Sequence, residues 1–286
     1  MTVTAEQVKS LRARTGAGMM ECKNALVESG GNADEAVEIL RKRGLAQAAK
    51  RAGRTTGEGL IGIVLSDDRS RGTMVEVNCE TDFVARTDDF RALVKEITRA
   101  AAKADDTVDP AALTAPGTPI GTRLSEAMAK VGENMAVSRV ARLTGDYIAS
   151  YVHFEKIGVM VAFGGVDAAT ATSDVFTAFA NEIAMQVAAA SPLHVSREEV
   201  PAATVESEKA IYRAQLEGAG KPAAVLDRIV EGKLTSFYEQ SVLLEQLSIR
   251  PEKSKLKVAD LLAEAASAAG RPLRILTFAR FKVGEV

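Results

Sequence analysis

The residue types that carry out covalent catalysis are scarce in this chain of 286 residues. It contains two cysteines, two histidines and no tryptophan. Cys79 and His153 are the minimum set for a thiol nucleophile with a general base. Cys79, however, ends an apolar run typical of a strand, and cysteine is among the most buried residue types. We therefore expect no catalytic residue, and a Cys79–His153 hydrolase is a minor alternative.

The sequence also offers little to a metal ion or a phosphate group. The cysteines and histidines, at positions 22, 79, 153 and 194, are too far apart in the chain for a local zinc cluster. No glycine cluster ends in the Gly-Lys-Ser/Thr of a phosphate-binding loop. Paired carboxylates such as Asp67 with Asp68 lie in polar stretches typical of solvated loops rather than of an acid–base pair. We expect no metal site and no cofactor.

Residues 78–86, Asn-Cys-Glu-Thr-Asp-Phe-Val-Ala-Arg, form the most distinctive segment. They join a predicted strand to a predicted helix, and Phe83, the first aromatic residue of the chain, follows Asp82 in what should be a turn. Two interpretations are open. Either Phe83 packs back on the core while Asp82 caps the following helix, or Phe83 is an exposed wedge beside a carboxylate. A phenylalanine entering a partner's pocket gains about 1.5–3 kcal/mol from burial, enough to anchor an interface.

The charge balance, 36 basic against 38 acidic residues, argues against bulk binding of nucleic acid but leaves a local basic patch open. Residues 41–54 form such a patch, with no acidic residue. We favour a solvated helix or linker there, and an RNA- or ribosome-associated adaptor is the alternative. Proteins stack single-stranded RNA on aromatic side chains, and none precedes Phe83. We expect no direct contact with nucleic acid.

The sequence predicts a cytoplasmic protein that does not enter a membrane. Its longest charge-free apolar stretch, residues 157–166, is about half of the roughly 20 residues that span a bilayer. The first ten residues lack the apolar region of a signal peptide. Two distant cysteines cannot build the disulfide framework of a small secreted protein.

The first 44 residues predict three short helices. Thr4 and Gln7 form a capping box for the first helix. Asn32 is the expected N-cap of the third, and Gly44 is its expected terminator, because glycine readily adopts the left-handed conformation that ends helices. We assign residues 1–55 to this module and its basic linker.

Two related α+β subdomains are predicted to follow. Residues 60–77 suggest a hairpin, and a helix from about Asp89 places apolar residues at positions 90, 93, 94 and 97. Strand-like runs recur near residues 147 and 157–163, and residues 176–183 then repeat the pattern of residues 90–97 at an offset of 86. This repetition indicates a divergent duplication. We assign residues 56–141 to the first subdomain, and residues 142–190 with 238–286 to the second.

Residues 191–237 predict an antiparallel helical hairpin inserted into the second subdomain. Ser196 and Glu199 suggest a capping box that opens a polar helix to about residue 217. Residues 218–222 turn the chain, and a second helix returns with a sparse apolar stripe. A helix from residue 258 and an alternating strand over residues 273–283 then rejoin the second subdomain. The fold class is therefore α+β.

Two long motifs resemble the signatures of one known family. Residues 11–26, LRARTGAGMMECKNAL, strongly resemble the N-terminal signature of bacterial elongation factor Ts, and residues 78–86 resemble its second signature. The likeness continues through residues 151–153, the hairpin and residues 280–285, and it covers essentially the whole chain. It implies an N-terminal three-helix module like the ubiquitin-associated (UBA) domain, two core subdomains and an inserted coiled-coil hairpin. Some members carry a further C-terminal helical module, so no contact of that module is carried over.

The resemblance also implies a function. Members are guanine-nucleotide exchange factors for elongation factor Tu, the GTPase that delivers aminoacyl-tRNA in protein biosynthesis. A segment matching residues 81–84 would enter beside the nucleotide site, dislodge Mg²⁺ and promote GDP release so that GTP can bind. By position, that role falls to the residues Thr81, Asp82, Phe83 and Val84.

The resemblance places other contacts on the N-terminal module and in the second subdomain. The face that grips the GTPase's nucleotide-binding domain would contain Arg12, Met19, Met20 and Lys23. His153 matches an interface position in the second subdomain, which would contact another domain of the GTPase. Of the adjacent residues Met19 and Met20, we expect Met19 to face the core of its helix. Whether the hairpin mediates self-association is left open.

Overall fold

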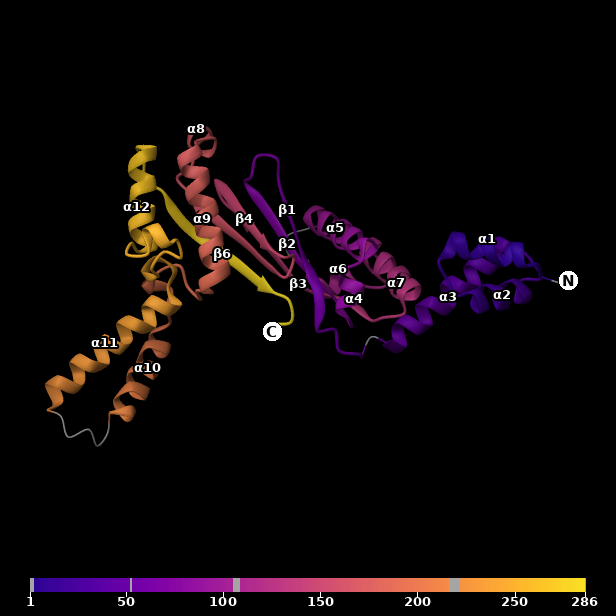
Figure 1. The fold of residues 1–286 in the computed structure, drawn as a ribbon, viewed down its shortest axis with the longest axis horizontal. Coiled ribbons are helices and arrows are strands. Elements are labelled where there is room, and N and C mark those ends of the chain that lie inside the picture. Colours follow the sequence, from indigo (N-terminus) through magenta and orange to yellow (C-terminus); the bar gives the residue numbers. More distant parts are fainter. Residues whose placement is uncertain (1–2, 52, 105–108, 217–221, 286) are drawn as a thin grey trace. The chain divides into compact units, whose positions relative to one another are not determined.

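The computed structural model describes residues 3–51, 53–104, 109–216 and 222–285 (Figure 1). The chain forms two compact units, each with helices and a three-stranded sheet. The first unit contains Met1–Val64, Thr73–Ala141 and Lys282–Val286, and the second contains Leu65–Gly72 and Arg142–Phe281. The predicted α+β class is confirmed.

The first unit begins with three helices, α1 (Ala5–Thr15), α2 (Met19–Glu28) and α3 (Ala33–Arg51). The predicted capping box of Thr4 and Gln7 is present. Asn32 Oδ1 accepts hydrogen bonds from the N–H groups of Asp34 and Glu35, at 3.1 and 3.3 Å, so its predicted capping role is confirmed. The three helices share a small core formed by Val8, Leu11, Cys22, Ala25, Leu26 and Ala36.

The prediction that Gly44 ends the third helix is wrong, because α3 continues to Arg51. A Cβ atom at Gly44 would lie 2.8 Å from the Cβ of Ala129 in helix α7 (Pro119–Val131). The missing side chain thus lets α3 and α7 approach closely, which is a different use of glycine from helix termination. The basic residues from position 41 to 51 are consequently part of a helix.

The first sheet has the strand order β1 (Glu58–Leu65), β2 (Arg71–Cys79), β3 (Met135–Thr144). The apolar stripe that the sequence predicts on helix α5 (Asp88–Lys103) faces the core. Its residues Phe90, Leu93, Val94 and Ile97 are all buried. The short helices α4 (Asp82–Ala85) and α6 (Pro110–Leu113) and helix α7 complete this unit. Sequence patterns missed β3, and they treated α4 as a turn.

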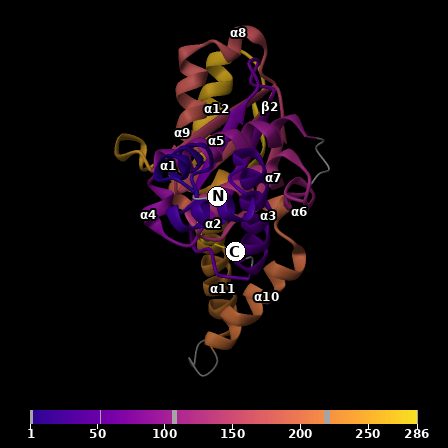
Figure 2. The ribbon, with the colours of Figure 1, turned by 90° about the vertical axis from the view of Figure 1, so that its right-hand side faces the viewer.

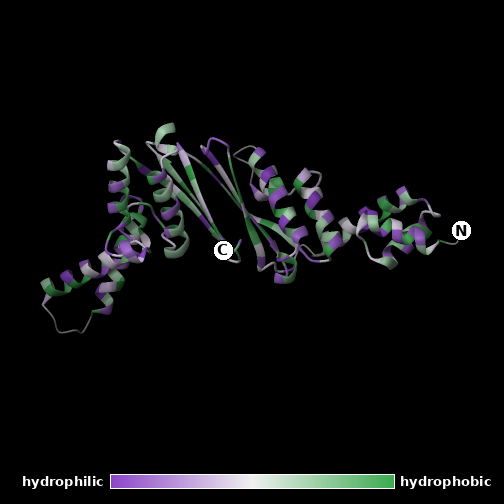
Figure 3. Ribbon diagram, turned by 45° about the horizontal axis from the view of Figure 1, so that its top comes forward, coloured by the Kyte–Doolittle hydropathy of each residue, from purple (hydrophilic) through white to green (hydrophobic). Residues whose placement is uncertain are grey.

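The second sheet has the order β4 (Tyr147–His153), β5 (Ile157–Gly164), β6 (Arg274–Lys282). Strands β4 and β5 are antiparallel and pair from Tyr147 with Phe163 to His153 with Ile157. Helices α9 (Asp174–Ala190) and α12 (Val258–Ala269) contribute to the core of this unit, which includes Phe163, Phe176, Ile183 and Leu243. The short elements are α8 (Ala168–Ala171), η1 (Arg197–Glu199), η2 (Leu243–Glu245) and η3 (Pro251–Lys253). Most of the helices carry both hydrophobic and hydrophilic residues (Figure 3).

Helices α10 (Ala202–Gln215) and α11 (Ala223–Ser241) follow α9 in the chain and lie side by side (Figures 1 and 2). The predicted capping box at Ser196 does not open α10, because residues 197–199 form the separate 3-10 turn η1 and Pro201 precedes the helix. Glu199 instead accepts a hydrogen bond from the N–H of Val195 at 2.9 Å. Of the predicted turn at 218–222, residues 218–221 lie outside the described residues.

In the part of the chain that the structure describes, no helix is both long enough and apolar enough to cross a bilayer.

Candidate functional site

The turn that carries Phe83 is a single helical turn, α4, at the end of strand β2. Thr81 caps it, with its Oγ1 accepting from the N–H of Val84 at 3.4 Å. The side chain of Phe83 is 79% exposed, whereas Ala85 on the other side of the turn is buried. Phe83 is therefore not packed back on the core. We call residues 81–86 the Phe83 turn.

Asp82 lies beside Phe83, but it does not cap the following helix. Thr87 has that role, because its Oγ1 accepts from the N–H of Phe90 at 3.2 Å. Asp82 instead pairs with Arg86 at 2.8 Å, across one turn. The carboxylate thus stays at the surface, and the arrangement supports the interpretation of an exposed wedge.

The Phe83 turn is held by residues that sequence reasoning missed. The N–H of Thr81 donates to Glu133 Oε2 at 3.1 Å, and the hydroxyl of Thr81 donates to Glu133 Oε1 at 2.7 Å. Glu133 follows α7, 52 positions along the chain from Thr81. No short-range pattern signals such a contact, because the spacing has no helical or strand periodicity.

Cys79 lies directly below this turn but cannot act as a nucleophile. It is fully buried, and its Sγ donates to the carbonyl oxygen of Thr81 at 3.2 Å. A substrate would need to reach the sulfur, and the packing around it leaves no such access. The burial of Cys79 therefore contradicts the hydrolase alternative.

The residues predicted on the N-terminal face, Arg12, Met19, Met20 and Lys23, are all exposed on α1 and α2. The prediction that Met19 faces the core is wrong, since it is 48% exposed and Met20 is 64% exposed. Met19 is the first residue of α2, and the core-facing positions of that helix begin one turn later, at Cys22. Both methionines are thus available to a partner.

In the second unit, His153 ends strand β4 next to an exposed aromatic residue that sequence reasoning overlooked. Phe154 is 83% exposed, and its ring centroid lies 4.3 Å from that of His153. Phe154 and Glu155 have φ values of 50° and 58°, the left-handed region that non-glycine residues rarely adopt. The Tyr151 hydroxyl lies 3.0 Å from His153 Nδ1. An aromatic residue in the three-residue turn between β4 and β5 was the available signal.

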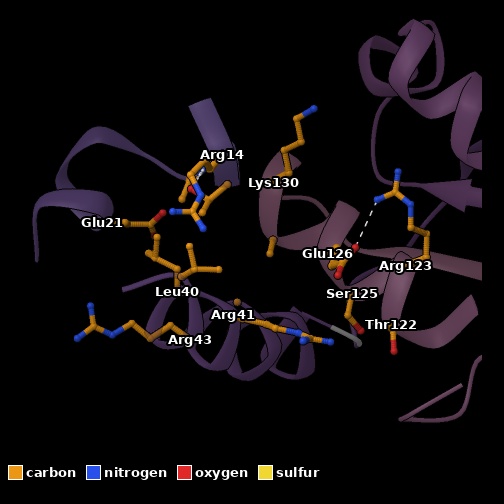
Figure 4. Close-up of a pocket in the computed structure, with 15 residues that line it drawn as sticks. Arg14, Glu21, Leu40, Arg41, Arg43, Thr122, Arg123, Ser125, Glu126 and Lys130 are labelled. Atoms are coloured by element: carbon orange, nitrogen blue, oxygen red, sulfur yellow. Dashed lines mark hydrogen bonds and ion pairs between the residues drawn. The ribbon is translucent and has the colours of Figure 1, made fainter. Parts of the chain in front are cut away.

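A cavity of about 370 Å³ lies in the first unit between the N-terminal helices and α7. Figure 4 shows its lining, which includes Arg41 from α3 and Glu126 from α7. Its other cations already pair with carboxylates: Arg14, Arg43, Arg123 and Lys130. None of the predicted site residues lines it. Because four of its five basic side chains already pair with carboxylates, this cavity offers little uncompensated positive charge to an anionic ligand.

These surfaces define the class of protein. Exposed apolar and charged side chains stand at the Phe83 turn, on helices α1 and α2, and at the β4–β5 turn. Within the described residues, no three potential metal ligands gather. The arrangement is that of a protein that binds other macromolecules through protruding side chains.

Comparison with known proteins identifies the family. The model of the family described as Elongation factor TS matches residues 80–285. The chain is 43% identical over 296 aligned residues to elongation factor Ts of Aquifex aeolicus (strain VF5), with 99% of each chain covered. It is 43% identical to that of Nautilia profundicola, covering 99% of this chain and 93% of the relative. For Beijerinckia indica the identity is 44%, with 99% and 92% covered. The chain belongs to the elongation factor Ts family.

Proposed function

We propose that the Phe83 turn is the part of this chain that releases nucleotide from elongation factor Tu. As a member of the elongation factor Ts family, the chain is a guanine-nucleotide exchange factor for elongation factor Tu in translation elongation. The observation that carries the proposal is the 79% exposure of Phe83 on a turn held by hydrogen bonds. Thr81, Asp82, Phe83 and Val84 would enter beside the nucleotide site of the GTPase.

The mechanism needs no covalent step. Mg²⁺ joins phosphate oxygens to protein ligands in such GTPases, and much of the nucleotide's affinity depends on it. An inserted Phe83 with the neighbouring Asp82 would fit a partner in which that metal position is disturbed. An exchange factor that binds the nucleotide-free partner most tightly lowers the partner's affinity for nucleotide. By linkage, bound nucleotide lowers the partner's affinity for the exchange factor by the same ratio. GDP then leaves, and GTP takes its place.

Two further surfaces would hold the partner while this happens. The exposed residues Arg12, Met19, Met20 and Lys23 offer a mixed apolar and basic face for the nucleotide-binding domain of the GTPase. His153, with the exposed Phe154 beside it, would contact another domain. Contacts on several surfaces add affinity without interfering with the wedge.

The finer organisation is also part of the proposal. We assign α1–α3, within residues 1–55, to a UBA-like module, and residues 56–141 and 142–190 with 238–286 to two related core subdomains. Residues 191–237 would form a coiled-coil hairpin, where Ile211 and Val225, 46% and 43% exposed, are candidates for self-association. We further propose a cytoplasmic location, no covalent catalysis, no membrane contact and no direct contact with nucleic acid.

Substitution of Phe83 by alanine tests the proposal. Release of fluorescent GDP from elongation factor Tu, followed by stopped flow with catalytic amounts of the chain, should slow by at least about tenfold, because burial of the ring is worth about 1.5–3 kcal/mol. The matched control is Leu193→Ala, another exposed apolar side chain at 72% exposure, which should keep the parental rate. Unchanged melting temperatures would show that both variants fold. A parental exchange rate for Phe83→Ala would refute the wedge.

A further inference from the structure

The Phe83 turn cannot be stable by its own helical bonds. Helix α4 has four residues, and its backbone bonds are those from the N–H of Ala85 to the oxygen of Thr81, at 3.2 Å, and from Arg86 to Asp82, at 3.1 Å. Isolated helices much longer than this are only marginally stable in water. Ala85 is the buried residue of the turn. Contacts from elsewhere in the first unit must therefore hold it.

Those contacts come from the loop between α7 and β3. Both carboxylate oxygens of Glu133 accept hydrogen bonds from Thr81, one from its N–H at 3.1 Å and one from its hydroxyl at 2.7 Å. Thr81 is also the N-cap of α4. Glu133 thus holds the residue that sets the starting direction of the turn. Hydrogen bonds to a charged acceptor are stronger than those between neutral groups.

A second carboxylate reaches in the opposite direction. Glu80 Oε1 accepts from the N–H of Asn134 at 2.6 Å and lies 3.4 Å from a guanidinium nitrogen of Arg54. The side-chain amide of Asn134 donates to the carbonyl oxygen of Arg54 at 2.8 Å. The two loops are therefore joined in both directions. The Glu133 side chain binds the backbone N–H of Thr81, and the Glu80 side chain binds the backbone N–H of Asn134. Such a pairing fixes both loops in one conformation.

We propose that Glu133 is a positioning residue for nucleotide exchange. Its carboxylate holds Thr81 so that the Phe83 ring is already directed outward before the partner binds. This inference rests on the proposed function of the Phe83 turn. A turn ordered in advance spends less of its interaction free energy on ordering when it binds.

The first test compares variants at position 133 in the full-length chain. Glu133→Ala removes both acceptors and should lower kcat/KM for GDP release from elongation factor Tu about tenfold. Glu133→Gln should restore most of the rate, because its amide oxygen can accept from the N–H of Thr81 while its NH₂ donates to the hydroxyl. The control is Glu126→Ala on α7, which pairs with Arg123 and should keep the parental rate. A parental rate for Glu133→Ala overturns the inference.

The second test separates positioning from general stability. In a Phe83→Ala background, Glu133→Ala should slow exchange by less than about twofold further, because the ring that it positions is gone. An undiminished tenfold loss in that background overturns the inference. Amide hydrogen exchange should quicken at residues 82–87 in both Glu133 variants, more in Glu133→Ala, while α5 keeps its protection. Unchanged protection of residues 82–87 also contradicts it.

The two proposals fail in different ways. If Phe83→Ala itself exchanges nucleotide at the parental rate, the proposed function of the Phe83 turn fails. If Phe83→Ala is slow but Glu133→Ala is not, only the positioning role fails.

Discussion

Phe154 and Phe83 are, in that order, the most exposed large hydrophobic side chains among the described residues. Each stands in a tight turn beyond the end of a strand, and each has polar support close by. Glu133 bonds to Thr81 beside Phe83, and Tyr151 contacts the His153 ring beside Phe154. Exposed aromatic side chains on ordered turns are typical of binding anchors.

At the residue scale, Phe154→Gly should affect stability and binding in opposite directions. Glycine relieves the left-handed strain at φ 50°, about 1–2 kcal/mol for a side-chain-bearing residue, so the melting temperature should rise by a few degrees. Loss of the ring should weaken binding to elongation factor Tu several-fold in isothermal titration calorimetry. Affinity equal to that of the parent would exclude Phe154 from the interface.

A second prediction at this scale concerns Asp68 in the loop between β1 and β2. The hydroxyl of Ser66 donates to it at 2.6 Å and the N–H of Ser70 at 3.0 Å, and these bonds lower the pKa of Asp68 from 3.8 to about 2. A depressed folded-state pKa means that the carboxylate stabilises the loop above pH 3.8 and loses this effect as the pH falls through about 2. Carboxyl NMR titration should give a midpoint near 2.

The control for Asp68 is Ser66→Ala. Removal of the hydroxyl that contributes most to the shift should move the pKa of Asp68 back toward 3.8. A midpoint near 3.8 in the parental chain would contradict the hydrogen-bonded loop.

At the scale of elements, two glycines inside helices serve opposite purposes. Gly44 in α3 faces Ala129 of α7, and a Cβ there would lie 2.8 Å from the Ala129 Cβ. Gly232 in α11 has nothing within 4 Å of the same built position. Glycine costs a helix about 1 kcal/mol relative to alanine. That cost is offset at Gly44 by close packing of two helices.

Alanine at the two positions should therefore change stability differently. Gly232→Ala should raise the free energy of unfolding by about 1 kcal/mol. Gly44→Ala should lose that gain through overpacking, which costs about 1–3 kcal/mol. Adding Ala129→Gly should recover part of the loss, beyond the sum of the single effects, in urea denaturation. Equal stabilisation by Gly44→Ala and Gly232→Ala would contradict the close approach of α3 and α7.

At the scale of the whole molecule, neither compact unit is a continuous piece of chain. The second unit takes Leu65–Gly72 from between two strands of the first sheet, and the first unit takes Lys282–Val286 from the end. In the first unit the N–H of Gly284 donates to Glu76 Oε1 at 3.2 Å, and the Arg139 guanidinium donates to the oxygen of Lys282 at 2.8 Å. Glu76 is only 2% exposed, so each of its donors matters.

Deletion of residues 283–286 should consequently destabilise the chain by about 1–2 kcal/mol, because the buried Glu76 carboxylate loses the Gly284 donor. Urea denaturation measures this change. Glu285→Gln, which breaks only the exposed pair of Lys282 with Glu285, should cost less than about 0.5 kcal/mol. If the deletion has no larger effect than Glu285→Gln, the C-terminal residues do not hold Glu76.

Strong local patterns predicted the regular elements well. The apolar stripe of α5, the cap at Asn32, the β4–β5 hairpin and the returning strand β6 all agree with expectation. Each depends on neighbouring residues, because helical and strand periodicity place apolar side chains on one face within a few positions. The errors at Gly44, Met19 and Ser196 concern the ends of helices, where packing competes with local preference.

The sequence by itself determined that this chain is an α+β protein with few catalytic side chains, and its motifs determined the family. It also drew attention to residues 78–86. Only the tertiary structure decided that Phe83 is exposed, that Met19 is available and that Gly44 continues its helix. The physical reason is distance along the chain. The Phe83 turn depends on Glu133, 52 positions beyond Thr81, and Gly44 depends on Ala129 in α7. Only folding brings such partners together.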